Sequence, residues 1–154
     1  MTQENSKQLL LKDLCARLPY EVKCIVTKSR TEEGQEGDVG KIKWVCLEGV
    51  ECIGNESFFS EFGNFKPYLF PLSSMTEEQK EEYCSLQQKV IYNNKGLVNS
   101  DVMEYVNWCY KNHIDINNLI PMGLAIDATG LNIYWVMTEK EKAKAYDEAL
   151  ERAK

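Results

Sequence analysis

The spacing of apolar and polar positions near the N-terminus predicts an amphipathic helix from Ser6 to Leu18. Its apolar residues recur every three or four positions and form one stripe: Leu10, Leu11, Leu14, Cys15 and Leu18. The Ser6 hydroxyl is expected to cap the first turn, because it can accept a hydrogen bond from a free amide there. Pro19 restricts the residue before it and is expected to end the helix.

A period of two follows the helical spacing and predicts four short strands, at residues 21–27, 41–47, 50–53 and 58–65. In the first strand Val22, Cys24 and Val26 are expected to share one face, and in the second Ile42, Trp44 and Cys46 are expected to lie on one side. A polar loop from Ser29 to Gly40 separates these strands, and Glu48-Gly49 marks a tight turn after them. Four antiparallel strands of this length predict a small SH3-like curled sheet or barrel.

Helical spacing returns after residue 75. The segment from Lys66 to Pro71 holds two prolines, and it is expected to cross in an extended form from the sheet to the helices. Thr76 and Gln79 have the spacing of a capping box and open a helix that is expected to end at Asn93-Asn94-Lys95-Gly96. A further helix is predicted from Ser100 to Tyr110.

Residues 114–136 predict short elements rather than one long one. Asp115 is expected to cap a turn, and Leu124 to Ile126 is expected to form a short strand. Asp127 to Gly130 predicts a turn held by the aspartate, with a return strand from Leu131 to Val136. A second capping box, Thr138 with Glu141, predicts a charged final helix.

Taken together, the patterns predict an α+β fold: an N-terminal helix, a small antiparallel SH3-like sheet or barrel, and a helical layer. Residues 1–137 are expected to form a single domain, sheet-rich over 19–70 and helical over 76–137. Residues 138–154 are expected to form a charged C-terminal helix. A length of 154 residues fits one domain with one hydrophobic core.

The charge balance argues against general binding to a nucleic-acid backbone. The chain has 18 basic and 24 acidic residues, a net charge of −6, and phosphate affinity comes from lysine and arginine. No apolar run approaches the roughly 20 residues that a membrane span requires, and Leu9-Leu10-Leu11 is too short for a signal peptide. A cytoplasmic location and no membrane partner are therefore expected.

The six cysteines contain no C-x-x-C pair, and with one histidine they favour reduced thiols over a metal site. The glutamate-rich stretches lack the ligand order of a calcium loop and are read as solvated surface. No phosphate-binding glycine loop and no nucleophile elbow occur, so no metal and no cofactor are predicted.

His113 is the only histidine, so a cysteine–histidine enzyme would have to use it. Cys109 lies four residues earlier and would share its face if the helix continued that far. The simpler interpretation places His113 at a helix C-terminus, where a positive charge is favoured. His113 and Cys109 are thus the catalytic candidates in a chain for which no catalytic site is predicted.

Aromatic residues provide the main binding candidates. Large aromatic side chains contribute much contact area for little conformational entropy, and those outside the core are expected to form an interaction groove. The predicted binding residues are Tyr20, Trp44, Phe59, Lys66, Tyr68 and Phe70.

Three separated motifs carry a family resemblance: Asp13 to Tyr20 (DLCARLPY), Lys66 to Glu78 (KPYLFPLSSMTEE) and Gly123 to Gly130 (GLAIDATG). Over residues 8–134 the chain resembles a family of small uncharacterised proteins encoded by Bacteroides-type gut bacteria and by their phages and prophages. The resemblance implies a mobile-element setting and supplies no catalytic residues.

The leading hypothesis is therefore a non-enzymatic protein-interaction module that acts on a host or phage protein. One alternative is a binder of a small anionic ligand, such as a signalling nucleotide sequestered during phage defence. It would use Arg17, Lys23, Lys41, Lys43 or Lys66 against an aromatic wall. The other alternative is the cysteine–histidine enzyme. Self-association into a homo-oligomer is also left open.

Overall fold

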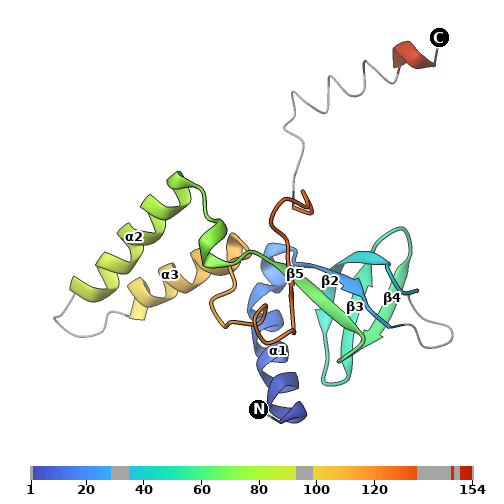
Figure 1. Ribbon diagram of the computed structural model, residues 1–154, viewed down its shortest axis with the longest axis horizontal. Helices are drawn as coiled ribbons and strands as arrows, with labels where there is room; N and C mark the ends of the chain where they lie inside the picture. The colour runs from blue at the N-terminus through green and yellow to red at the C-terminus, as the bar shows by residue number, and fades with distance from the viewer. Residues whose placement is uncertain (1, 29–34, 93–98, 135–146, 148–149, 154) are drawn as a thin grey trace.

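Helix α1 (Gln3–Arg17) stands between two parts of the fold, an open mixed sheet and the helical pair of α2 (Glu77–Tyr92) and α3 (Asn99–Lys111). Figure 1 shows this arrangement in the computed structural model, which describes residues 2–28, 35–92, 99–134, 147 and 150–153. The predicted order of an N-terminal helix, a sheet and then helices is confirmed, and so is the α+β class.

The N-terminal helix begins one turn earlier than its pattern predicts. Thr2 is the N-cap, because its hydroxyl oxygen accepts a hydrogen bond from the Asn5 amide at 3.3 Å. The predicted cap, Ser6, lies inside the helix and donates its hydroxyl to the Thr2 carbonyl. The chain leaves α1 through a short 3-10 turn, η1 (Leu18–Tyr20), where Pro19 stands at a position that needs no amide hydrogen.

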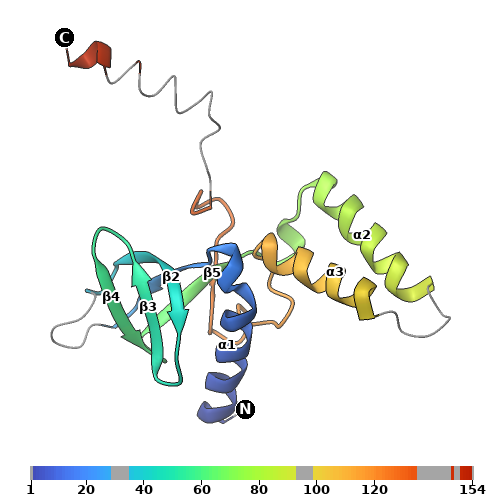
Figure 2. The same cartoon turned by 180° about the vertical axis from the view of Figure 1, so that it is seen from behind.

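Six strands form the sheet in the order β4-β3-β2-β1-β5-β6. They are β1 (Lys23–Val26), β2 (Val39–Val45), β3 (Gly49–Ile53), β4 (Ser57–Glu61), β5 (Phe65–Leu69) and β6 (Ile126–Asp127). In this order, every pair of neighbouring strands from β4 through β5 is antiparallel. The last strand, β6, pairs with β5 in parallel. Strands β4 and β6 are the two edges, so among the described residues the sheet is open and not a closed barrel (Figure 2).

The predicted crossing segment from Lys66 to Pro71 is largely a strand, which corrects the sequence interpretation. Pro67 lies opposite Cys24 in the β1–β5 ladder. In the same register the Thr27 amide donates a hydrogen bond to the Asn64 carbonyl. Opposed pairs in an antiparallel ladder are alternately hydrogen-bonded and not hydrogen-bonded, and the Cys24–Pro67 pair is one that is not. The proline nitrogen therefore faces away from β1, and the ladder loses no donor.

The helical pair follows its sequence signals closely. Thr76 and Gln79 form the predicted capping box, with the Thr76 amide donating to the Gln79 side chain and the Gln79 amide donating to the Thr76 hydroxyl. Asp115 caps the next turn, since its carboxylate accepts from the amides of Leu119 and Ile120 at 2.8 Å. The predicted helix end at residues 93–96 lies outside the described residues.

The last predicted elements have mixed outcomes. The Asp127 carboxylate accepts from the Thr129 amide and hydroxyl, which confirms that turn. The return strand predicted from Leu131 is not formed by residues 131–134, which make a turn. Its remainder and the Thr138–Glu141 capping box lie outside the described residues, although residues 147 and 150–152 are helical.

The core lies between α1 and the inner face of the sheet. Leu10 and Leu14 of α1 meet alternate side chains of the strands, and Leu119 and Ala125 close one end. The prediction that Val22, Cys24 and Val26 share one face is confirmed, and all three are buried. The whole set of buried core residues is Leu10, Leu14, Val22, Cys24, Ile42, Val50, Cys52, Phe65, Leu69, Leu119 and Ala125.

Candidate functional site

A β-bulge in β2 decides which side chains the sheet presents to solvent. The register runs from Ile42 opposite Cys52 to Trp44 opposite Glu51, so one extra residue, Lys43, is inserted between them. Ile42 stays on the inner face, but Trp44 moves to the outer face and is 53% exposed. The prediction that Trp44 lies on the same side of the strand as Ile42 is therefore wrong.

The strand pairing defines an outer sheet face, on the side away from the core. Trp44 and Phe59 both stand opposite Glu51, on either side of it. Lys41 stands opposite Lys23 and Ile53, and Val39 opposite Ile25, which pairs with Lys66. The outer sheet face consists of Lys23, Ile25, Val39, Lys41, Trp44, Glu51, Ile53, Phe59, Lys66 and Tyr68.

Apolar side chains on this face remain exposed to water. Ile53 is 43% exposed and Val39 39%, in addition to Trp44. Phe59 is half-buried, because its ring lies over Gly49, where an added Cβ would come within 2.9 Å of the ring. Several apolar groups on one face of neighbouring strands form the type of surface that marks interaction sites, whereas single exposed apolar residues do not.

Lysines occupy the other half of the outer sheet face. The Lys41 ammonium pairs with the Glu21 carboxylate at 2.8 Å, and the Lys23 ammonium donates to the Ile133 carbonyl at 2.9 Å. The hydrogen bond and charge of Lys41 lower the pKa of Glu21, and Lys43 and Lys23 lower it further. This carboxylate therefore lies in the combined positive field of three lysines.

The remaining predicted binding residues, Tyr20, Tyr68 and Phe70, are buried or half-buried. Tyr20 is half-buried in the turn η1. Tyr68 is buried, and its carbonyl accepts a hydrogen bond from the Tyr134 hydroxyl at 2.7 Å. Phe70 is half-buried and packs against the ring of Tyr134 at 5.9 Å between centroids. The structure thus places Trp44, Phe59, Lys66 and the buried Tyr68 on one side of the sheet, with Glu51 between Trp44 and Phe59, and places Tyr20 and Phe70 outside the strands.

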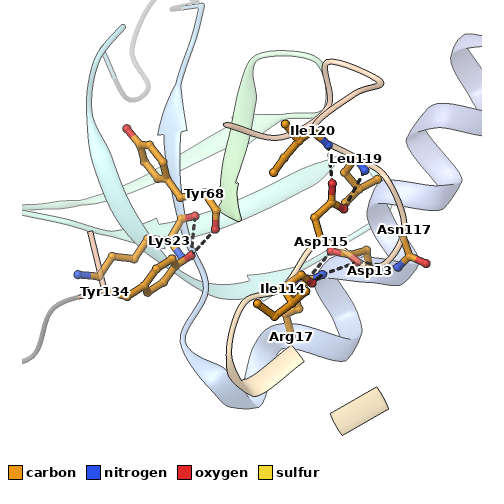
Figure 3. A network of polar contacts seen from close by, with 10 residues as sticks. All are labelled: Asp13, Arg17, Lys23, Tyr68, Ile114, Asp115, Asn117, Leu119, Ile120 and Tyr134. Atoms are coloured by element: carbon orange, nitrogen blue, oxygen red, sulfur yellow. Dashed lines mark hydrogen bonds and ion pairs between the residues drawn. The ribbon is translucent and has the colours of Figure 1, made fainter. Parts of the chain in front are cut away.

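Arg17 is unavailable to a ligand because it is fully buried (Figure 3). Its guanidinium makes two hydrogen bonds to Asp13, at 2.6 and 3.0 Å, and one to the Ile114 carbonyl at 2.8 Å. Asn117 donates to the same carboxylate. This network joins α1 to the segment after α3, so it is structural and supplies no charge to an anion site.

His113 and Cys109 are buried in separate surroundings. The His113 ring stacks on Tyr134 at 3.7 Å, and its Nδ1 has no hydrogen-bond partner within the described part of the chain. Burial, with the charges of Arg17 and Lys23, lowers the pKa of His113 to about 4. Burial raises the pKa of Cys109 to about 11, although the thiol's hydrogen bond with Tyr105 opposes this. The pair therefore carries the thiol and neutral-imidazole forms at neutral pH.

A hollow of about 420 Å³ lies between α2 and α3. Its lining is largely acidic, and the Trp108 indole donates to the Glu82 carboxylate at 2.7 Å. No group of three or more metal-ligating side chains occurs among the described residues. None of the helices in the described ranges is both long enough and apolar enough to cross a membrane.

Sequence reasoning missed Ile25, Val39 and Ile53 as members of the outer sheet face. A signal was present, because Ile25 lies between the inward residues Cys24 and Val26 and is itself apolar. A strand that is apolar on both faces presents a second apolar surface, which is usually buried against another part of the chain or a partner. The sequence holds no comparable signal that Trp44 lies on the outer sheet face. A bulge changes the pairing of the strand but is not marked by particular residue types.

Comparisons of the chain with protein-family models, with curated proteins and with solved structures found no match.

Proposed function

We propose that this chain is a non-enzymatic protein-interaction module whose outer sheet face binds a partner protein. The observation that carries the proposal is the exposure of Trp44, at 53%, next to Ile53 and Phe59 on one face of the sheet. Tryptophan is enriched among the residues that dominate binding energy, and bulges commonly re-aim a side chain at functional sites.

The composition of the face supports a protein partner. Trp44, Ile53 and Phe59 around Glu51, with lysines along one side, give the face the mixed apolar and charged composition of protein interfaces. On the basis of the resemblance stated for the sequence, we propose a partner from a Bacteroides-type bacterium or one of its phages. The partner would then belong to host or phage machinery, as the sequence hypothesis states.

The test compares variants in affinity capture from a lysate of such a bacterium. The double variant Trp44→Ala/Ile53→Ser removes the exposed apolar centre. The matched control is Ile91→Ser, which removes an equally apolar side chain that is 62% exposed on α2. We expect a specific partner to be retained by the unmodified chain and by the control, and at least tenfold less by the double variant.

Capture of the same proteins in the same amounts by all three chains would contradict this proposal. Circular dichroism on each variant checks that the fold is retained, since both substitutions fall on solvent-exposed positions. A control that loses binding as strongly as the double variant would point instead to the helical pair.

The lysines favour a second candidate, a small anionic ligand. Lys23 and Lys41 stand directly opposite each other, and a bound anion would relieve their repulsion. A thermal-shift screen against nucleotides tests this candidate, because a ligand that binds the folded state raises the melting temperature. A shift that the double variant Lys23→Gln/Lys41→Gln abolishes, but Trp44→Ala retains, would favour it over the protein partner.

A further inference from the structure

Resting on the proposed binding function, we infer that the outer sheet face takes an acidic segment of its partner, in which carboxylates stand beside apolar side chains. The proposal commits to an extended peptide segment as the occupant. It follows from how charge and apolar surface are distributed over the strands.

The first step concerns the lysine half of the face. Lys23 and Lys41 occupy directly opposed positions on β1 and β2, and Lys66 lies on β5 beside Ile25. Like charges that face each other across a ladder are unfavourable unless an anion lies near them. The Lys23 ammonium is bonded to a neutral carbonyl, so its charge is not compensated by that contact.

The second step is that, within the described part of the chain, one carboxylate forms an ion pair with this half. Glu21 forms its ion pair with Lys41, and its side chain is 71% exposed. Its lowered pKa reports the field of Lys41, Lys43 and Lys23 together. Three lysines near this exposed carboxylate leave net positive charge among the described residues, which an acidic segment would complement.

The third step fixes the orientation of the segment. The aromatic half contains Glu51 between Trp44 and Phe59, and the Ser57 hydroxyl donates to its carboxylate at 3.0 Å. An acidic side chain placed there would be repelled by Glu51. The partner's carboxylates are therefore directed to Lys41 and Lys66, and its apolar side chains to the tryptophan half.

The test is a selection of random 12-residue peptides displayed on phage, carried out on the immobilised full-length chain. We expect the selected peptides to be rich in aspartate and glutamate together with aromatic or aliphatic residues. With the best synthesised peptide, Lys41→Gln/Lys66→Gln should weaken binding at least fivefold, and Trp44→Ala at least tenfold. The control Lys111→Gln, at an exposed lysine of α3, should change it less than twofold.

The outcomes separate the two proposals. Neutral or basic peptides that still depend on Trp44 would overturn the acidic partner and leave the binding function standing. Peptides that bind independently of Trp44 and of the lysines would overturn both. The last measurement is sedimentation velocity of the chain alone. A dimer that dissociates in the Trp44→Ala variant would show that a second copy covers this face. That result would overturn the proposed acidic segment.

Discussion

Lowering the pH from 7 to 5 is expected to destabilise the protein through His113. The pKa of His113 is about 4 in the folded chain, against an ordinary value of 6.5. As the pH falls through 6.5, the unfolded chain binds a proton that the folded chain does not, so unfolding becomes more favourable. The loss continues down to the folded pKa.

The magnitude follows from the two pKa values. Between pH 7 and pH 5, proton linkage lowers the free energy of unfolding by about 2 kcal/mol. By pH 4, the pKa of His113 in the folded chain, the loss reaches about 3 kcal/mol. The substitution His113→Phe keeps an aromatic ring against Tyr134 and removes the titration. Because Nδ1 has no partner within the described residues, the replacement loses no hydrogen bond there.

The assay is urea unfolding at pH 7, 6 and 5, followed by tryptophan fluorescence. His113 is the only histidine, and the two chains contain the same acidic residues. The difference between the wild type and His113→Phe therefore isolates the imidazole. The unmodified chain should lose about 2 kcal/mol more than the variant over this range. Parallel pH profiles would refute the reasoning, since they would mean that the buried ring titrates at its ordinary value.

Three further predictions concern stability, each measured by urea unfolding. Asp13→Asn leaves the buried Arg17 guanidinium without its counter-charge and should cost about 3–5 kcal/mol; an effect below 1 kcal/mol would contradict the ion pair. Gly49→Ala would bring a Cβ within 2.1 Å of the Ser60 carbonyl oxygen, so most of the folded population should be lost; near-normal stability would show that β3 and β4 pair differently. Thr76→Ala removes one half of the capping box and should cost about 1 kcal/mol, and an unchanged midpoint would argue against that cap.

Local signals in the sequence predicted the elements that depend on local chemistry. The capping box at Thr76, the caps of Asp115 and Asp127, and the inward phase of β1 each involve residues within five positions of one another. Their hydrogen bonds and periods can be recognised without knowing what packs against them.

The features that were missed depend on distant partners. Pro67 lies within a strand because the register with β1 turns its nitrogen away from the ladder, and the segment alone does not show this register. Trp44 reaches the outer sheet face through a bulge that only the pairing with β3 reveals. Arg17 is buried because Asp13 and the Ile114 carbonyl meet it there, although arginine is rarely a core residue.

The long reach of these contacts has a consequence for protein synthesis. Arg17 meets the Ile114 carbonyl 97 residues later, and Tyr134 meets the Lys23 backbone 111 residues later. At roughly 5–20 residues per second, a ribosome needs about 5–20 s to deliver Ile114 after Arg17. The residues of β1 to β5 are made within that interval, before the carbonyl acceptor of the guanidinium exists. The hydrogen bond that ties α1 to the segment after α3 can therefore form only late in synthesis.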